Sequence, residues 1–193
     1  MSKRKLLSLV LLIVLMLVSC TSKSEVPVEK CIVGTWQLSG NEAFARALLP
    51  PGSFDQETLS FVDAGGVVGY SFDEKGLVFI DVIAWMSQLS VQVDDQSYPL
   101  DMNMIGEASG SYSLDGDQLS VIAVDHSNLA FEAFLDGMSM MRSLNVDEFA
   151  PLFNAAYSLA QIECNETTLR LNIIDQPGIS QPIEFTRVTE KQE

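Results

Sequence analysis

A Ser-His-Asp hydrolase site in this chain would have to use His126, its one histidine. The residue lies in Asp125-His126-Ser127, which holds the three residue types of a serine hydrolase. No Gly-x-Ser-x-Gly turn accompanies it, and an isolated histidine at the end of a strand is usually solvated. No spacing of acids singles out a carboxylate pair for glycoside cleavage, and no glycine-rich phosphate loop is present. We therefore expect no enzyme, no catalytic residue and no cofactor.

Methionines are the second group of residues that could do chemistry. Met102-x-Met104 and Met138-x-Met140 each place two thioethers on one face of a strand, and thioethers suit Cu(I). Methionines also fill irregular protein interiors, which is the interpretation we favour, so we expect no metal. The same side chains could line an adaptable apolar cavity. The residues that we predict to contact an apolar ligand are Trp85, Met102, Met104, Phe131, Met138 and Met140.

The first twenty residues have the pattern of an export signal. Three basic residues at 3–5 precede an apolar run at 6–18, which is shorter than the about 20 residues that span a bilayer. The ending Leu-Val-Ser-Cys at 17–20 resembles a bacterial lipoprotein signal, which implies that Cys20 becomes the lipidated first residue of the mature chain. A plain secretory signal cut elsewhere is the alternative. We predict a signal peptide at 1–19, a lipidated tether at 20–30 and a membrane-anchored protein on the extracytoplasmic side of the cell envelope.

The mature chain is strongly acidic. The full chain has 11 basic and 26 acidic residues, and removal of the leader takes away three basic residues and leaves 8 − 26 = −18. Such a charge repels phosphate backbones and anionic lipid headgroups, so nucleic acid is not an expected partner. About 160 residues of mature chain can bury one core, and we expect one monomeric domain at 31–193.

Two cysteines, Cys31 and Cys164, remain once Cys20 is assigned to lipid. An even number of cysteines in an oxidising compartment predicts a disulfide between them. Two buried free thiols are the alternative. The bond would hold the first strand beside the last hairpin.

Most of the mature chain is predicted to form strands. The first covers 32–38, alternating apolar residues indicate strands at 83–93 and 129–135, and a final hairpin joins 167–174 to 183–188. Residues 77–86 are apolar on both faces, so a buried helix there is an alternative.

Two stretches of the chain repeat one hairpin pattern. Tyr-Ser-Phe-Asp at 70–73 and Tyr-Ser-Leu-Asp at 112–115 are each followed, after three residues, by an apolar strand. Turns with Asp and Gly between β-forming residues indicate hairpins, and we interpret Asp115-Gly116-Asp117 as a turn rather than a calcium loop.

Helix-like segments lie at 41–49, with Asn41 as the expected N-cap, and at 148–161. Sequential antiparallel strands with one or two helices predict a mainly β fold, an up-and-down barrel without exposed sheet edges.

The two ends of the folded region resemble those of lipocalin-like (calycin) barrels, particularly bacterial lipoproteins of that type. Gly34-Thr35-Trp36 matches the Gly-x-Trp of their first strand, and Phe185-Thr186-Arg187-Val188 matches their closing strand. The resemblance implies that Arg187 lies over Trp36 at the base of the barrel, where Gly34 permits close packing.

The resemblance also implies a function, namely a membrane-anchored lipoprotein whose barrel binds a small apolar ligand. A surface structural or protein-interaction module with a filled barrel is the alternative. A copper-binding envelope protein is the third hypothesis.

Overall fold

The strands of the chain form a closed ring. The computed structural model describes residues 27–49, 58–139, 159–174 and 181–189. These residues form one nine-stranded antiparallel sheet in the order β4-β3-β2-β1-β9-β8-β7-β5-β6. An additional pairing of β4 with β5 closes the sheet, while β6 pairs only with β5. The predicted mainly β, up-and-down barrel is confirmed.

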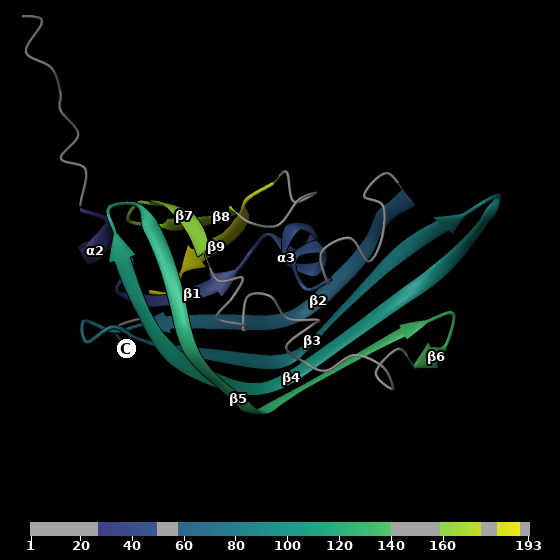
Figure 1. Cartoon of the computed structure of the whole chain (residues 1–193), viewed down its shortest axis with the longest axis horizontal. Helices are drawn as coiled ribbons and strands as arrows, with labels where there is room; N and C mark the ends of the chain where they lie inside the picture. The colour runs from purple at the N-terminus through teal and green to yellow at the C-terminus, as the bar shows by residue number, and fades with distance from the viewer. Residues whose placement is uncertain (1–26, 50–57, 140–158, 175–180, 190–193) are drawn as a thin grey trace, which may run out of the picture.

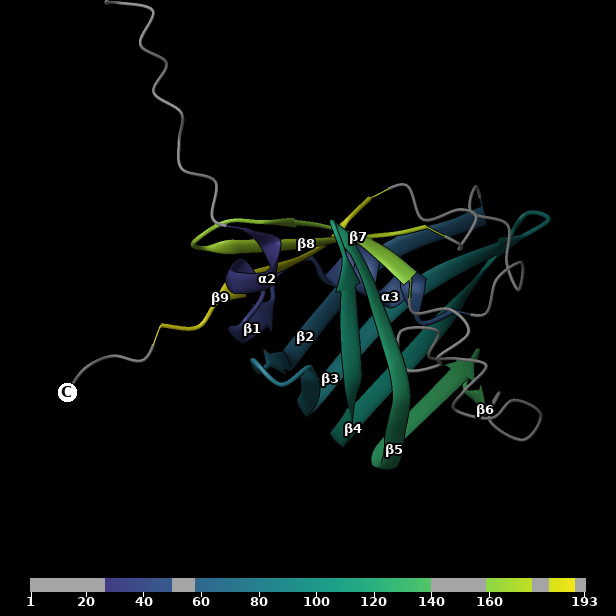
Figure 2. The ribbon, with the colours of Figure 1, turned by 60° about the vertical axis from the view of Figure 1, so that its left-hand side comes forward.

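Long and short strands occupy different walls of this barrel. In Figure 2 the short strands β7, β8 and β9 form the upper wall, and the long strands β2, β3 and β4 form the lower wall. Strands β4 and β5 bend strongly in the middle of their length (Figure 1). The strand bounds are β1 (Gly34–Leu38), β2 (Leu59–Phe72), β3 (Leu77–Val93), β4 (Gln96–Asp115), β5 (Gln118–Leu135), β6 (Met138–Ser139), β7 (Leu159–Cys164), β8 (Thr168–Ile173) and β9 (Ile183–Arg187).

Two short helices accompany the sheet in the described residues. Helix α2 (Val28–Cys31) forms where the sequence predicted the end of the tether, and the strand predicted at 32–38 begins at Gly34. Helix α3 (Asn41–Ala47) confirms the helix predicted at 41–49 and lies between the two walls (Figure 1). Its N-cap is Gly40 rather than Asn41, so the predicted cap is wrong. No helix in the described part of the chain is long and apolar enough to cross a bilayer.

The second predicted helix, at 148–161, falls largely outside the described residues. Its last three positions, 159–161, begin β7, so the prediction is wrong there. Ala160 is buried and Gln161 is exposed, and pairing with both β5 and β8 satisfies the backbone of these two residues as a strand.

The predicted hairpin turns are confirmed. Asp73 accepts hydrogen bonds from the backbone amides of Lys75 (2.9 Å) and Leu77 (2.8 Å), which fixes the β2–β3 turn. Asp115 pairs with Gln118 across the β4–β5 turn. No group of three His, Cys, Asp or Glu side chains among the described residues could hold a metal ion.

A bulge in β3 changes which side chains face the interior. Ile83 is 59% exposed and Trp85 is fully buried, so the prediction that they share one face is wrong. The register shifts between Val82 and Trp85, where Ala84 has φ 48°. The additional residue switches the inward positions from even to odd numbers. Segment 77–86 is therefore strand, and the helical alternative is excluded.

The bend continues into the neighbouring strand β4. Gly106 has φ +116°, and a Cβ there would lie 2.1 Å from the backbone oxygen of Asn128. A larger residue does not fit this close approach of β4 and β5 without a shift of the backbone.

Candidate functional site

The first and last strands meet at the base of the barrel. Trp36 on β1 pairs with Arg187 on β9, and the Arg187 Cζ lies 4.1 Å from the centroid of the indole ring. The Trp36 side chain is buried and donates a hydrogen bond from Nε1 to the Ile32 carbonyl at 2.7 Å. A buried indole covered by a guanidinium is a favourable cation–π arrangement.

The guanidinium of Arg187 on β9 also binds two other stretches of backbone. It donates hydrogen bonds to the carbonyl oxygens of Cys31 (2.5 Å), Val33 (3.0 Å) and Glu166 (2.9 Å). These carbonyls belong to the segment before β1 and to the turn between β7 and β8. The side chain therefore connects the start of the barrel to the turn between β7 and β8.

Gly34 makes room for that guanidinium. Its φ is +133°, and a Cβ at this position would lie 2.5 Å from Arg187 Nη1. Both the conformation and the space favour glycine. The Gly-x-Trp pattern is thus explained by one contact, since Gly34 admits the side chain that covers Trp36.

The predicted disulfide between Cys31 and Cys164 is confirmed. The two Cα atoms are 6.0 Å apart, and the bond joins residues separated by 133 positions. Cys31 ends α2, and Cys164 ends β7. The bond lies next to the contacts of Arg187, because the Cys31 carbonyl accepts one of its hydrogen bonds.

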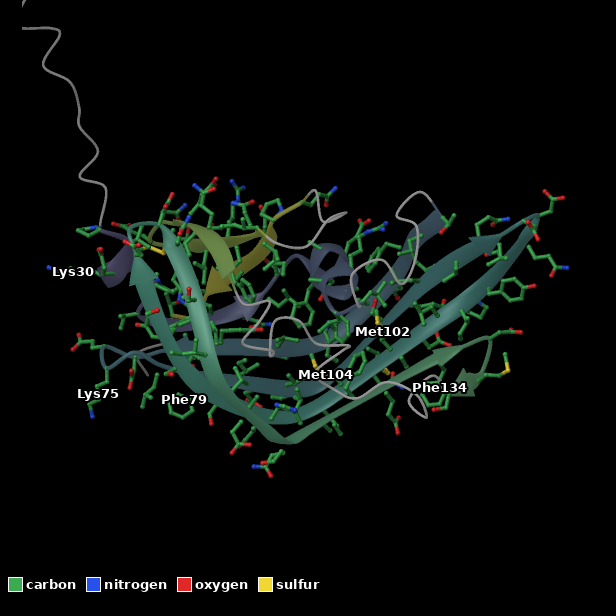
Figure 3. All side chains as sticks on the ribbon, viewed as in Figure 1. Lys30, Lys75, Phe79, Met102, Met104 and Phe134 are labelled. Carbon is green, nitrogen blue, oxygen red and sulfur yellow. A yellow bond between two sulfur atoms is a disulfide. The ribbon has the colours of Figure 1, made fainter. Side chains whose placement is uncertain are left out.

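Three of the predicted ligand-binding side chains form one row across neighbouring strands. Trp85 on β3 pairs with Met104 on β4, which pairs with Phe131 on β5. Met102 follows on the same inward face of β4 (Figure 3). All four are almost inaccessible, with Trp85 and Met102 at 0%, Met104 at 1% and Phe131 at 2% exposure. A side chain lining an empty ligand cavity would retain accessible area, so these four are packed as core.

Trp85, Met102, Met104 and Phe131 form an inner cluster, and helix α3 contacts it at Trp85. The ring of Phe44 meets Trp85 edge to face with centroids 5.2 Å apart. Asn41, instead of capping the helix, accepts a hydrogen bond from Trp85 Nε1 at 3.2 Å. The indole thus has both an aromatic contact and a polar partner, which is how a buried tryptophan is normally held.

Met138, another predicted contact, does not join this cluster. Met138 lies on β6 and is 67% exposed. Met140 and the predicted lipidation site Cys20 lie outside the described residues. Binding of Cu(I) by Met102 and Met104 stays a prediction.

Among the described residues, one buried hydroxyl in the interior has no hydrogen-bond partner. Tyr70 Oη makes no hydrogen bond, and burial raises the pKa of Tyr70 strongly above the usual tyrosine value. The residue lines a cavity of about 20 Å³, which is room for roughly one water molecule. The other residues around this cavity are apolar: Phe72, Leu119, Val121, Ala160, Leu171 and Ile173.

The Asp125-His126-Ser127 segment has the geometry of a local turn. The Ser127 amide donates a hydrogen bond to Asp125 Oδ1 at 3.0 Å. Hydrogen bonds from the Ser127 backbone and side chain hold the pKa of the Asp125 carboxyl below its usual value. In a hydrolytic triad the serine would bond to the histidine, whereas here it bonds to the acid.

Sequence reasoning missed the outer face of the long strands. Val67 on β2 pairs with Ile83 on β3, and the β3 bulge places Ile83 beside Ile105 on β4. These three, with Phe79 and Met86 on β3, are exposed apolar side chains on adjacent strands. We call them the outer row: Val67 36%, Phe79 50%, Ile83 59%, Met86 58% and Ile105 56% exposed. The apolar residues on both faces of 77–86 were the signal for it.

A surface groove of about 390 Å³ adjoins the outer row. Phe79 lines it together with the carboxylate residues Asp81, Glu107 and Asp125. Asp81 and Glu107 are register partners on β3 and β4, so two like charges stand directly opposite each other. Neither carboxylate makes an ion pair with any residue in the described ranges.

The chain was compared with protein-family models, curated proteins and solved structures. No family model matches the chain, and no curated protein or solved structure is significantly similar to it.

Proposed function

We propose that the chain is a lipid-anchored lipoprotein of the cell envelope that presents a lipocalin-like barrel and works through its outer surface as an interaction module. The single observation that carries the proposal is the packing of Trp85, Met102, Met104 and Phe131, whose exposures are 0–2%. Side chains this well packed stabilise the fold, and a ligand would have to displace them.

Co-purification tests the proposal. The protein would be purified from membranes, denatured and extracted with solvent, and the extract would be compared by mass spectrometry with a mock purification from cells lacking the protein. We expect no small molecule beyond the membrane lipids that both samples contain. A compound recovered at one equivalent per chain would overturn the proposal.

An apolar ligand in the barrel is the second candidate. The observation that favours it is the partnerless hydroxyl of Tyr70 beside an apolar cavity, because a ligand with one hydrogen-bonding group would satisfy it. The cavity of about 20 Å³ would have to widen to admit such a ligand. The same extraction would identify the compound.

The proposed membrane anchor has its own test. Cys20→Ser removes the acyl acceptor, so we expect the variant to leave the membrane fraction, while Ser24→Ala, which keeps Cys20 and the disulfide, should stay in it. Retention of the Cys20→Ser variant in membranes would show that the anchor is assigned wrongly.

A further inference from the structure

The long-strand wall of the barrel combines exposed apolar side chains with a large excess of acids. Residues 59–139, which contain β2 to β6, hold 13 acidic residues and a single basic one, Lys75, so their net charge is 1 − 13 = −12. Lys75 lies in the β2–β3 turn at one end of the barrel (Figure 3). The centre of the wall therefore contains no cation of its own.

The outer row is contiguous rather than scattered. Val67, Ile83 and Ile105 occupy three adjacent strands, which are about 4.8 Å apart in a sheet. Phe79 and Met86 extend the row along β3 over seven residues, or roughly 20 Å. Contiguous exposed apolar surface rimmed by polar residues marks interaction sites.

Two acids in and beside this row face each other, which is an unfavourable arrangement in the free protein. Asp81 lies between Phe79 and Ile83 on the outward face and stands opposite Glu107. Facing carboxylates without a cation repel each other. A partner that supplies a positive charge between them would relieve this repulsion as it binds.

We propose that the outer row and its acids bind a cationic amphipathic segment of another polypeptide. This inference rests on the proposed function and adds the chemistry of the partner. A helix of about 14 residues is roughly 20 Å long, which matches the row along β3. Its apolar face would cover Phe79, Ile83 and Met86, and its Lys or Arg side chains would reach Asp81 and Glu107.

The negative charge around the outer row disfavours two other binding partners. A second copy of the chain would place Asp81 and Glu107 against the same acids of its partner. An anionic lipid surface would be repelled by a wall with a net charge of −12. A basic polypeptide is attracted by the same field, and steering of this kind raises association rates.

The test uses the full mature chain, residues 20–193, with Cys20→Ser, so that no acyl chain offers a competing apolar surface. Three synthetic 15-residue peptides would be titrated by fluorescence anisotropy in moderate salt: an amphipathic helix of Leu and Lys, the same peptide with Glu for each Lys, and the same peptide with Ser for each Leu. We expect the first to bind at least tenfold more tightly than either of the others. Equal binding of the Lys and Glu peptides would overturn the proposal.

Two pairs of variants locate the binding. Ile83→Ser with Ile105→Ser should weaken binding of the Leu-Lys peptide at least tenfold, whereas Val93→Ser with Val188→Ser changes equally exposed apolar residues elsewhere and should leave it within twofold. Equal losses in both pairs would overturn the proposal.

A third variant pair depends on charge alone. Asp81→Asn with Glu107→Gln should weaken binding at least fivefold and reduce its salt dependence. It should unfold at the same or a higher urea concentration than the parent, since it removes a repulsive pair. Unchanged affinity would overturn the proposed role of the two acids.

The outcomes separate this inference from the proposed function. An empty barrel with no preference for the Leu-Lys peptide would refute the partner chemistry alone. A ligand recovered from the barrel would refute the proposed function, whatever the peptides do.

Discussion

Replacing Arg187 by methionine should remove the side-chain contacts that join β9 to the start of the barrel and to the β7–β8 turn. The guanidinium donates three hydrogen bonds to backbone carbonyls and lies over the Trp36 ring. A hydrogen bond from a charged group contributes about 1.5–3 kcal/mol, and we take roughly 1 kcal/mol each because this side chain is half-buried and water can reach the freed carbonyls. The cation–π contact adds about 1 kcal/mol. The expected loss is therefore about 3–4 kcal/mol, a large part of the roughly 5–15 kcal/mol that stabilises a typical domain.

Urea unfolding followed by tryptophan fluorescence measures this loss, and thermal unfolding should show a Tm lower by about 10 °C. The matched control is Arg170→Met on β8. Arg170 is exposed and forms surface ion pairs with Glu163 (3.8 Å) and Glu184 (2.8 Å), which contribute less than about 1 kcal/mol. An Arg187→Met loss no larger than that of Arg170→Met would refute the reasoning.

Three further changes test the same region and the interior. Gly34→Ala should lower the free energy of unfolding by about 2 kcal/mol or more. In a double-mutant cycle the loss should be smaller in the Arg187→Met background, because the clash with the guanidinium is then absent. Additive losses would contradict this explanation. Tyr70→Phe removes a hydroxyl that has no partner, so the free energy of unfolding at neutral pH should stay unchanged or rise by up to about 1 kcal/mol, and a clear loss would point to a bound partner. Burial raises the pKa of Tyr70 above the 10.0 of a free tyrosine, so above pH 10 the unfolded chain loses the phenol proton that the folded chain keeps. The free energy of unfolding should therefore fall as the pH rises above 10, by about 1.4 kcal/mol per unit. Tyr70→Phe should reduce this slope in urea titrations between pH 9 and 11. Removing the disulfide by Cys31→Ser with Cys164→Ser should lower the free energy of unfolding by about 5 kcal/mol, because the unfolded chain regains the entropy of a loop of 133 residues. A loss under 1 kcal/mol in urea unfolding would contradict this entropic explanation.

Features that depend on local chemistry were predictable from the sequence. The Asp and Gly residues at 73–76 and 115–117 specify turns wherever they occur, and they fixed the order of the hairpins. Counting cysteines, on the expectation that the chain is exported, gave the pair Cys31 and Cys164, since number leaves one pairing once Cys20 is set aside.

Features that depend on pairing partners were not predictable. The bulge at Ala84 changes the inward positions of β3, and it coincides with register shifts against both β2 and β4, which the alternation of 83–93 does not encode. The residues at 159–161 fit an amphipathic helix by periodicity, yet pairing with β5 and β8 makes them a strand. Tertiary pairing overrides local pattern at both places.

The candidate site was predicted in part. Trp85, Met102, Met104 and Phe131 do come together inside the barrel, as their apolar character indicated. Apolar type alone does not distinguish a cavity lining from a packed core, because the difference lies in volumes that only the assembled fold defines. The outer row was missed for the converse reason, since apolar residues on both faces of 77–86 indicated burial.

The central claim, that the inner cluster is core rather than a ligand site, is tested most directly by fluorescence quenching with a brominated fatty acid. Trp36 and Trp85 are the chain's two tryptophans, both are fully buried, and Trp85 lies in the inner cluster. Bromine quenches an indole only at close range, so we predict unchanged emission from the mature chain up to the concentration at which the fatty acid forms micelles. Saturable quenching at one equivalent that Trp85→Phe abolishes would contradict the account.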